Sequence, residues 1–239
     1  RLSCLKREAK YLPREYEDEA LGENVLVVEK KGKKVYFVNG QTAMPVENGD
    51  RYDLLIVGSN QVPNFRSFGD TLNYGKNNGL IRIAEHPFVE THRGMGQALL
   101  EKHVEDFDAI ETHNSQAIFP SWVTKVPFIG HALSRARREM NLKALVFAMQ
   151  YNKQGVATSD AHRIEDAGLS YIHWEGEIDD SSEEKFLTQL RDRIIFGNFD
   201  SFRRYENPIA WVSWVWTFQK GIKRFENSNE YTCSQELRG

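Results

Sequence analysis

The sequence has few cysteines and no long apolar run, and both absences exclude classes of protein. Its 239 residues include only two cysteines, Cys4 and Cys233, near opposite ends of the chain. Without a CxxC pair, a zinc site made of thiolates is not expected, and two free thiols in a reducing cytoplasm are the simplest interpretation. No apolar stretch approaches the about 20 residues that span a bilayer, and residues 1–24 lack the apolar core of a signal peptide. We therefore expect a cytoplasmic protein with no membrane contact.

A strong charge of one sign is also lacking. The formal net charge is −3, and 40% of the residues are hydrophobic and 27% charged, as is typical of a soluble globular protein. This balance predicts no broad electrostatic attraction to nucleic acid or to an anionic membrane. The length is ordinary for a single α/β barrel and allows a sizeable buried core.

Short apolar runs alternate with helical stretches along the chain. Tyr52–Val57 is nearly continuously apolar and is closed by Gly58, a pattern typical of a strand covered on both faces. Other β-like runs lie at residues 25–28, 35–38, 80–84, 107–112 and 155–158, and helical stretches at 97–104 and 131–150. Ser181 and Glu184 form a capping box that predicts the start of a helix, which Gly197 would end.

No repeat and no linker divides the chain, so the alternation predicts one α/β domain over residues 1–239. We expect a barrel core over residues 25–175. Helices within residues 176–239 would close the barrel.

Polar residues directly follow three of the predicted strands. His86 comes after strand 80–84, His113 and Asn114 come after strand 107–112, and Asp160 with His162 comes after strand 155–158. The carboxyl ends of parallel barrel strands form one rim, and that rim holds the active site of such folds. These side chains are therefore expected to converge although they are far apart in the sequence.

The spacing of Asp160 and His162 has a chemical meaning. Residues two apart on an extended segment project to the same side, so a carboxylate and an imidazole can reach a shared cation. Such ligands suit Zn, Mn or Fe, and a carboxylate can also act as a base on water. The spacing therefore makes Asp160 and His162 candidates for metal-ligand and catalytic roles.

Several short segments of the sequence resemble motifs of the PHP superfamily, named for polymerase and histidinol phosphatase. They lie within residues 33–175, in the order of the family, at residues 38–42, 53–58, 79–88, 107–114, 157–163 and 166–171. The resemblance implies a distorted (β/α)7-type TIM-like barrel whose rim binds up to three divalent metal ions. It also implies a metal-dependent phosphoesterase that hydrolyses a phosphate monoester or a nucleotide or oligonucleotide end with activated water.

The resemblance also implies site residues. By motif position His86, Asp160 and His162 are metal ligands, and either Asn114 or the neighbouring His113 is a further one. The ions would be Mn, Zn or Fe. Arg163 directly follows the predicted ligand His162 and would pair with the phosphate of a small phosphorylated substrate or nucleotide.

Two departures from the family pattern bear on the function. The His-x-His pattern of the family's first motif is absent, since no histidine precedes His86. In addition, Gln41 stands where the family has a metal-bridging glutamate. A neutral amide is a poor bridging ligand, although Gln41 remains a candidate. The start at Arg1 favours loss of an N-terminal part, and hence a barrel without its first βα units. Gln41 favours the alternative function, a catalytically degenerate PHP-like scaffold or binding subunit.

An apolar stripe occurs near the C-terminus. Its members follow helical spacing and are Trp211, Trp214, Val215, Phe218, Ile222 and Phe225. We predict that this Trp211–Phe225 helix packs on the barrel. A homo-oligomer interface and a membrane surface are the competing interpretations, in that order.

Overall fold

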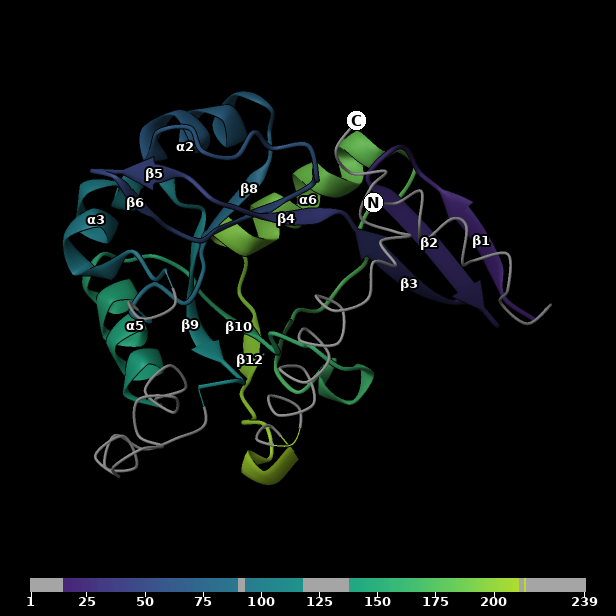
Figure 1. Cartoon of the computed structure of the whole chain (residues 1–239). Helices are drawn as coiled ribbons and strands as arrows, with labels where there is room; N and C mark the ends of the chain where they lie inside the picture. Colours follow the sequence, from purple (N-terminus) through teal and green to yellow (C-terminus); the bar gives the residue numbers. More distant parts are fainter. Residues whose placement is uncertain (1–14, 90–92, 118–137, 211–212, 214–239) are drawn as a thin grey trace, which may run out of the picture.

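The computed structural model describes residues 15–89, 93–117, 138–210 and 213, and its centre is a five-stranded mixed sheet (Figure 1). The strand order is β10-β9-β8-β7-β4. These strands are Gly40–Ala43 (β4), Leu54–Val57 (β7), Ile81–Ala84 (β8), Ala109–Asn114 (β9) and Gly155–Thr158 (β10). β8, β9 and β10 are parallel, whereas β7 is antiparallel to both β8 and β4. The carboxyl ends of β4, β8, β9 and β10 and the start of β7 therefore share one edge of the sheet.

The predicted (β/α)7 barrel is wrong. In the described part of the chain the central sheet is open, with β4 and β10 as its edges. The runs assigned to the first barrel strands, Val25–Lys30 (β2) and Lys33–Val38 (β3), instead pair with each other and with Glu17–Ala20 (β1). This three-stranded antiparallel sheet stands to one side of the central sheet (Figure 1). Lys31 and Gly32 have φ values of 52° and 75°, the left-handed pair that closes a tight hairpin, so β2 and β3 pair antiparallel and not as parallel barrel strands.

Two further pairs of short strands complete the described sheet structure. They are Val46–Glu47 (β5) with Asp50–Arg51 (β6), and Tyr171–His173 (β11) with Asp200–Phe202 (β12). β11 precedes the helix of residues 183–196 and β12 follows it. Their pairing brings the chain back beside β10 after that helix.

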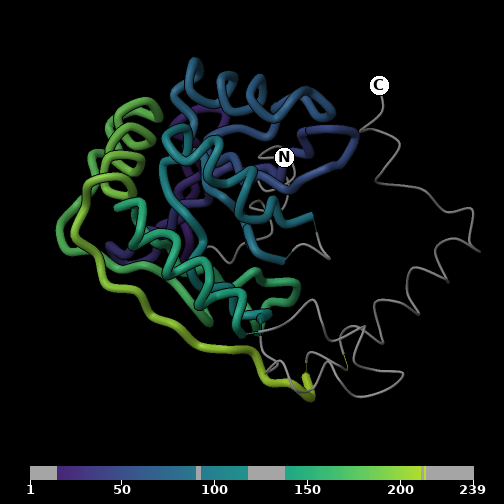
Figure 2. The backbone as a smooth tube through the Cα atoms, turned by 90° about the vertical axis from the view of Figure 1, so that its left-hand side faces the viewer, coloured from purple at the N-terminus to yellow at the C-terminus, as the bar shows by residue number. Residues whose placement is uncertain are grey.

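Helices cover both faces of the central sheet. Phe68–Asn77 (α2), Gly96–Lys102 (α3) and Arg138–Gln150 (α5) share one apolar core with the sheet, and Glu183–Phe196 (α6) contributes to a second. The first core includes Ile56, Leu72 and Phe147, and the second includes Ile83 and Ile194. Figure 2 shows α6 on the opposite side of the sheet from α2. Short 3-10 turns lie at Val104–Asp106 and Ile164–Asp166.

Most predicted elements in the described part have counterparts close to the expected bounds. The helix expected to open at a Ser181–Glu184 capping box is capped one residue later, because the Ser182 hydroxyl accepts from Lys185 N at 3.3 Å. It ends at Gly197 as predicted. This helix packs on an open sheet and closes no barrel.

The predicted Trp211–Phe225 helix lies outside the described residues apart from Ser213, so its packing stays a prediction. In the described part of the chain, no helix is long and apolar enough to cross a membrane.

Candidate functional site

Acidic and imidazole side chains gather where the strands of the central sheet end on one edge. This strand-end cluster comprises Asp53 before β7, Glu85 and His86 after β8, Glu111 and Asn114 on β9, Thr158 on β10, and Asp160 and His162 after β10. The parallel arrangement of β8, β9 and β10 brings them together, as expected for the carboxyl ends of parallel strands.

Glu111 joins the ends of the three parallel strands. One carboxylate oxygen, Oε2, accepts from the main-chain N–H of His86 at 2.5 Å. The other, Oε1, accepts from the hydroxyl of Thr158 and from Asn114 Nδ2, the latter at 3.3 Å. Only 5% of Glu111 is exposed, so these donors replace water around a buried carboxylate. Glu111 thereby fixes the positions of β8 and β10 relative to β9 at the site.

The structure separates the two alternative ligands on β9. The amide of Asn114 also donates to Asp160 Oδ2 at 3.0 Å, so Asn114 belongs to the strand-end cluster. The ring of His113 points elsewhere, with Nε2 3.4 Å from Arg204 O and Nδ1 3.4 Å from Asn141 Nδ2. Burial lowers the pKa of His113, which favours the neutral ring at neutral pH. His113 therefore has a packing environment, and Asn114 contacts a predicted ligand.

His86 lies against Asp53. Its Nε2 is 3.8 Å from Asp53 Oδ2, and burial lowers the pKa of the imidazole while Asp160 and Asp53 oppose that shift. His86 and Asp160 both have left-handed backbone conformations, with φ of 27° and 45°. Such conformations cost energy in residues other than glycine and persist where the surroundings hold them. Here the Glu111 carboxylate and the Asn114 amide each hold one of the two.

His162 is exposed and contacts its own segment. Its Nδ1 is 2.8 Å from the main-chain oxygen of Asp160 and 3.8 Å from Asp160 Oδ1. Because a carbonyl oxygen only accepts, Nδ1 carries the proton and Nε2 the lone pair of the neutral ring. This tautomer is the one that a metal-binding histidine with a carbonyl partner adopts.

The carboxyl groups of the cluster are buried and close to one another, so each disfavours ionisation of the next. Burial, followed by the charge of Glu111, raises the pKa of Glu85 to about 8. Burial, followed by the charge of Asp160, raises the pKa of Glu111 to about 7. Glu85 Oε1 accepts from the Thr42 hydroxyl at 3.2 Å, while its buried Oε2 has no hydrogen-bond partner among the residues that the structure describes. Within the described residues, neither Glu85 nor Glu111 forms an ion pair with Lys or Arg.

The donors of the strand-end cluster fit a divalent cation by their chemistry. Carboxylate and imidazole groups are ligands for Zn, Mn and Fe, and a cation would partner the buried Glu85 Oε2 and favour the ionised form of the carboxyl groups. The side chains are arranged in pairs, however, and among the described residues no group of three His, Cys, Asp or Glu converges to hold a metal ion. Coordination by three of them would require side-chain rotation.

Gln41 is engaged away from the cluster. Its Nε2 donates to Val62 O at 2.8 Å and its Oε1 accepts from Val62 N at 3.1 Å, so both ends of the amide pair with the main chain. The same Nε2 lies 3.3 Å from Asn64 Oδ1, and that oxygen accepts from Met44 N at 3.0 Å. The amide therefore fastens the loop of residues 59–66 along β4, a task that requires both a donor and an acceptor.

Arg163 is engaged by two carboxylates of its own chain. Its Nε and Nη2 donate to the two oxygens of Asp166 at 3.0 and 2.5 Å, and Nη2 also contacts Glu206 Oε1 at 2.5 Å. The guanidinium lowers the pKa of the Asp166 carboxyl. The predicted pairing of Arg163 with a substrate phosphate would have to compete with these contacts.

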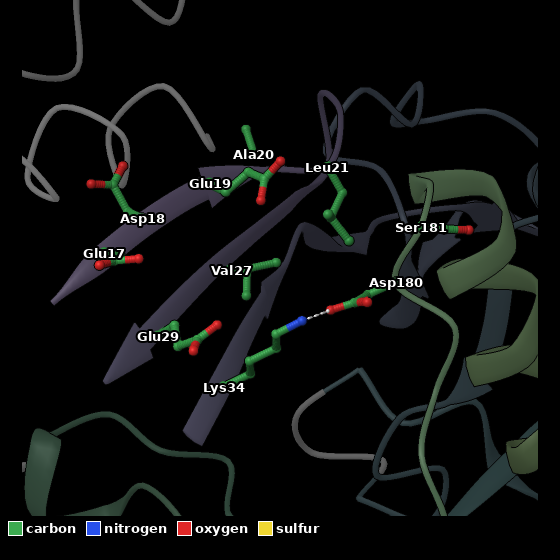
Figure 3. Close-up of a pocket in the computed structure, with 10 residues that line it drawn as sticks. All are labelled: Glu17, Asp18, Glu19, Ala20, Leu21, Val27, Glu29, Lys34, Asp180 and Ser181. Atoms are coloured by element: carbon green, nitrogen blue, oxygen red, sulfur yellow. Dashed lines mark hydrogen bonds and ion pairs between the residues drawn. The ribbon is translucent and has the colours of Figure 1, made fainter. Parts of the chain in front are cut away.

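A second acidic region lies beside the three-stranded sheet (Figure 3). It is a recess of about 600 Å³, lined among others by Glu17, Glu19 and Glu29, with Lys34 paired to Asp180 at 2.6 Å. It shares no residue with the strand-end cluster. Its acidic side chains are exposed or partly exposed, so water solvates them and no ligand follows from them.

Sequence reasoning missed the carboxylates that organise the site. Glu85 precedes the predicted ligand His86, and Glu111 interrupts an apolar strand. A charged residue within a buried strand needs a partner, and that signal was available in the sequence. Asp53 had no such signal, because its role depends on the antiparallel insertion of β7 beside β8.

Comparison with known proteins gives one match, which covers part of the chain. Residues 138–194 match the family model described as PHP-associated. The match covers α5, β10 with the Asp160–His162 segment, β11 and most of α6, and it shows a relationship to the PHP superfamily. No curated protein and no solved structure gives a significant match to the chain.

Proposed function

We propose that the protein is a metal-dependent phosphoric ester hydrolase that cleaves a phosphate monoester or a nucleotide or oligonucleotide end. The observation that carries the proposal is the crowding of carboxyl groups in the strand-end cluster, which repel one another when they ionise. Glu85, Glu111 and Asp160 meet at the ends of three strands, and the pKa values of the two glutamates are raised. A divalent cation offsets the charge of the ionised carboxyl groups, and the relationship to the PHP superfamily supports this chemistry.

The residues have separate roles in this proposal. His86, Asp160 and His162 would hold the cation, which when bound supplies activated water for attack on phosphorus. Asn114 orients the Asp160 carboxylate through its amide, and Glu111 holds the main chain of His86. Gln41 and His113 are left out of the ligand set because their side chains contact other groups.

The test is release of phosphate from mononucleotides and short oligonucleotides with Mn²⁺, compared with the same protein in EDTA. Asp160→Asn and His162→Ala are expected to abolish the metal-dependent rate. Matched controls are Asp200→Asn and His173→Ala, since both residues are exposed and pair with each other in β11–β12 away from the cluster. Activity that survives His162→Ala unchanged would rule out this site.

A second candidate function is a PHP-like scaffold or binding subunit without chemistry. The amide of Gln41 favours it, because that side chain fastens a loop where the resemblance implies a bridging glutamate. The pairwise arrangement of the described donors favours it as well. Elemental analysis separates the candidates: a protein that stays empty after incubation with Mn²⁺ or Zn²⁺ supports the scaffold, whereas stoichiometric metal supports the hydrolase.

A further inference from the structure

We infer that Arg93 is the residue that binds the phosphate group of a phosphorylated ligand beside the strand-end cluster. This inference deepens the proposed function by naming an anion-binding residue for the same site. It does not depend on turnover, because binding of phosphate can be measured in a protein that hydrolyses nothing.

Asp53 fixes Arg93 next to the cluster. The main-chain N–H of Asp53 donates to Arg93 O at 3.0 Å, and Arg93 Nη1 lies 3.4 Å from Asp53 Oδ1. The other oxygen of Asp53 is 3.8 Å from His86 Nε2. One buried carboxylate, whose side chain is 7% exposed, thus lies between the guanidinium and the predicted metal ligand.

Val89 and Gly94, near Arg93 in the chain, are fixed by main-chain hydrogen bonds. Val89 N donates to His86 O and Gly94 N donates to Val89 O, both at 2.9 Å. A Cβ on Gly94 would lie 2.7 Å from main-chain atoms of Val89 and 2.8 Å from His86 O, so a larger residue does not fit there. The start of the Arg93 side chain is therefore held at a defined distance from His86.

The donor edge of Arg93 is available, in contrast to two other arginines. Arg82 and Arg163 each use Nε and Nη2 as a fork on one carboxylate, that of Asp108 and that of Asp166 respectively. In Arg93 the contacts are made by Nη1, which reaches Asp53 and, at 3.2 Å, Met44 Sδ. No contact within the described part of the chain involves its Nε–Nη2 edge.

The chemistry of that edge selects the ligand. A guanidinium fork matches two oxygens of a phosphate in planar, bidentate geometry. The Arg93 side chain is 50% exposed, so a ligand can reach it from solvent. Acidic residues repel a terminal phosphate. A phosphate can therefore bind beside the cluster only if positive charge, from a metal cation and a guanidinium, lies next to it. Arg93 supplies a positively charged group beside the acidic residues Glu85, Glu111 and Asp160.

The experiment measures binding of inorganic phosphate and of AMP, with adenosine as the arm that lacks a phosphate. Isothermal titration is carried out with Mn²⁺ on the wild type, Arg93→Ala, Arg93→Lys and the control Arg66→Ala, whose exposed side chain has no described partner. We expect Arg93→Ala to weaken phosphate and AMP binding about tenfold or more, as for loss of hydrogen bonds to a charged group. The phosphate affinity of Arg93→Lys should lie between those of the wild type and Arg93→Ala, and the affinity of Arg66→Ala should equal that of the wild type.

The outcomes distinguish this inference from the proposed function. Equal phosphate affinity in wild type and Arg93→Ala, or no phosphate binding by the wild type, overturns the inference even if hydrolysis occurs. Loss of phosphate binding in Arg93→Ala supports the inference even if the protein hydrolyses no ester, in which case only the proposed function fails. In an active protein, Arg93→Ala should raise KM far more than it lowers kcat. Melting temperatures of all variants identify a folding defect, and Arg93→Lys then carries the test.

Discussion

The carboxylate of Glu111 accepts a hydrogen bond from the main-chain N–H of His86 at 2.5 Å, across two neighbouring parallel strands. His86 has a left-handed backbone conformation that exposes this N–H to a buried acceptor. The main chain of the predicted metal ligand His86 is thus held by Glu111, a residue 25 positions further along the chain. The site is thus organised from β9, the middle of the three parallel strands.

Replacing Glu111 should damage the site by removing this link. In Glu111→Gln one oxygen still accepts, but the new NH₂ group faces the donors of Thr158 and Asn114 and cannot accept from them. We expect a loss of about 1–3 kcal/mol in unfolding free energy, measured by urea denaturation, and a lower kcat on any substrate.

The control for that variant is Glu184→Gln, an exposed residue on α6, which should change neither quantity. A Glu111→Gln protein with the stability and kcat of the wild type would contradict the organising role of Glu111.

Gln41→Glu should destabilise the protein and should not restore a metal site. The new carboxylate would lie next to the carbonyl oxygen of Val62, which the amide now approaches at 2.8 Å as a donor. Loss of one hydrogen bond and repulsion between oxygens should cost about 1–3 kcal/mol, seen as a lower melting temperature. Gln61→Glu, in the same loop but exposed, is the matched control. An extra equivalent of Mn²⁺ bound by Gln41→Glu, with stability retained, would show that position 41 faces the metal instead.

Stability in EDTA should fall as the pH rises. The pKa values of Glu85 and Glu111 are raised in the folded protein, to about 8 and about 7. The folded state therefore binds more protons than the unfolded state between the ordinary glutamate pKa and these values. Their stabilising contribution is complete below the unfolded pKa of about 4.3 and is lost as the pH rises through about 7 to 8.

Thermal unfolding between about pH 5 and pH 8.5 measures this dependence, and Glu85→Gln should flatten it because an amide does not titrate. Mn²⁺ should stabilise the protein most at the alkaline end, where the carboxylates are ionised. A melting temperature that rises with pH in EDTA would contradict the raised pKa values.

The main effect of Arg163→Met should be a loss of stability, not a loss of substrate binding. The side chains of Asp166 and Glu206 are each 2% exposed and would lose their shared cation. Removing one partner of buried charged groups is destabilising, and the loss is reduced here because the Arg163 side chain is itself 26% exposed. Chemical denaturation measures the loss, with Arg203→Met as an exposed control. A raised KM with unchanged stability would instead support the substrate-binding role that the sequence predicted for Arg163.

The sequence by itself determined the local structure and the chemistry that this protein can offer. Apolar runs bounded by Gly58, Gly79 and Gly197 predicted strands and a helix end, because hydrophobic periodicity and chain termination depend on neighbouring residues. Likewise, the position of Asp160 directly after an apolar run placed it at a sheet edge, beside the end of β9.

Only the tertiary structure decided how these pieces combine. A hairpin through Lys31 and Gly32 and a reversed β7 gave an open mixed sheet in the described part, since strand pairing depends on contacts between distant residues. Partners were decided in the same way: Asn114 reaches Asp160 while His113 turns to Asn141. For polar side chains the same residue type binds a loop, a carboxylate or a ligand, and the choice depends on which groups the fold places within hydrogen-bonding distance.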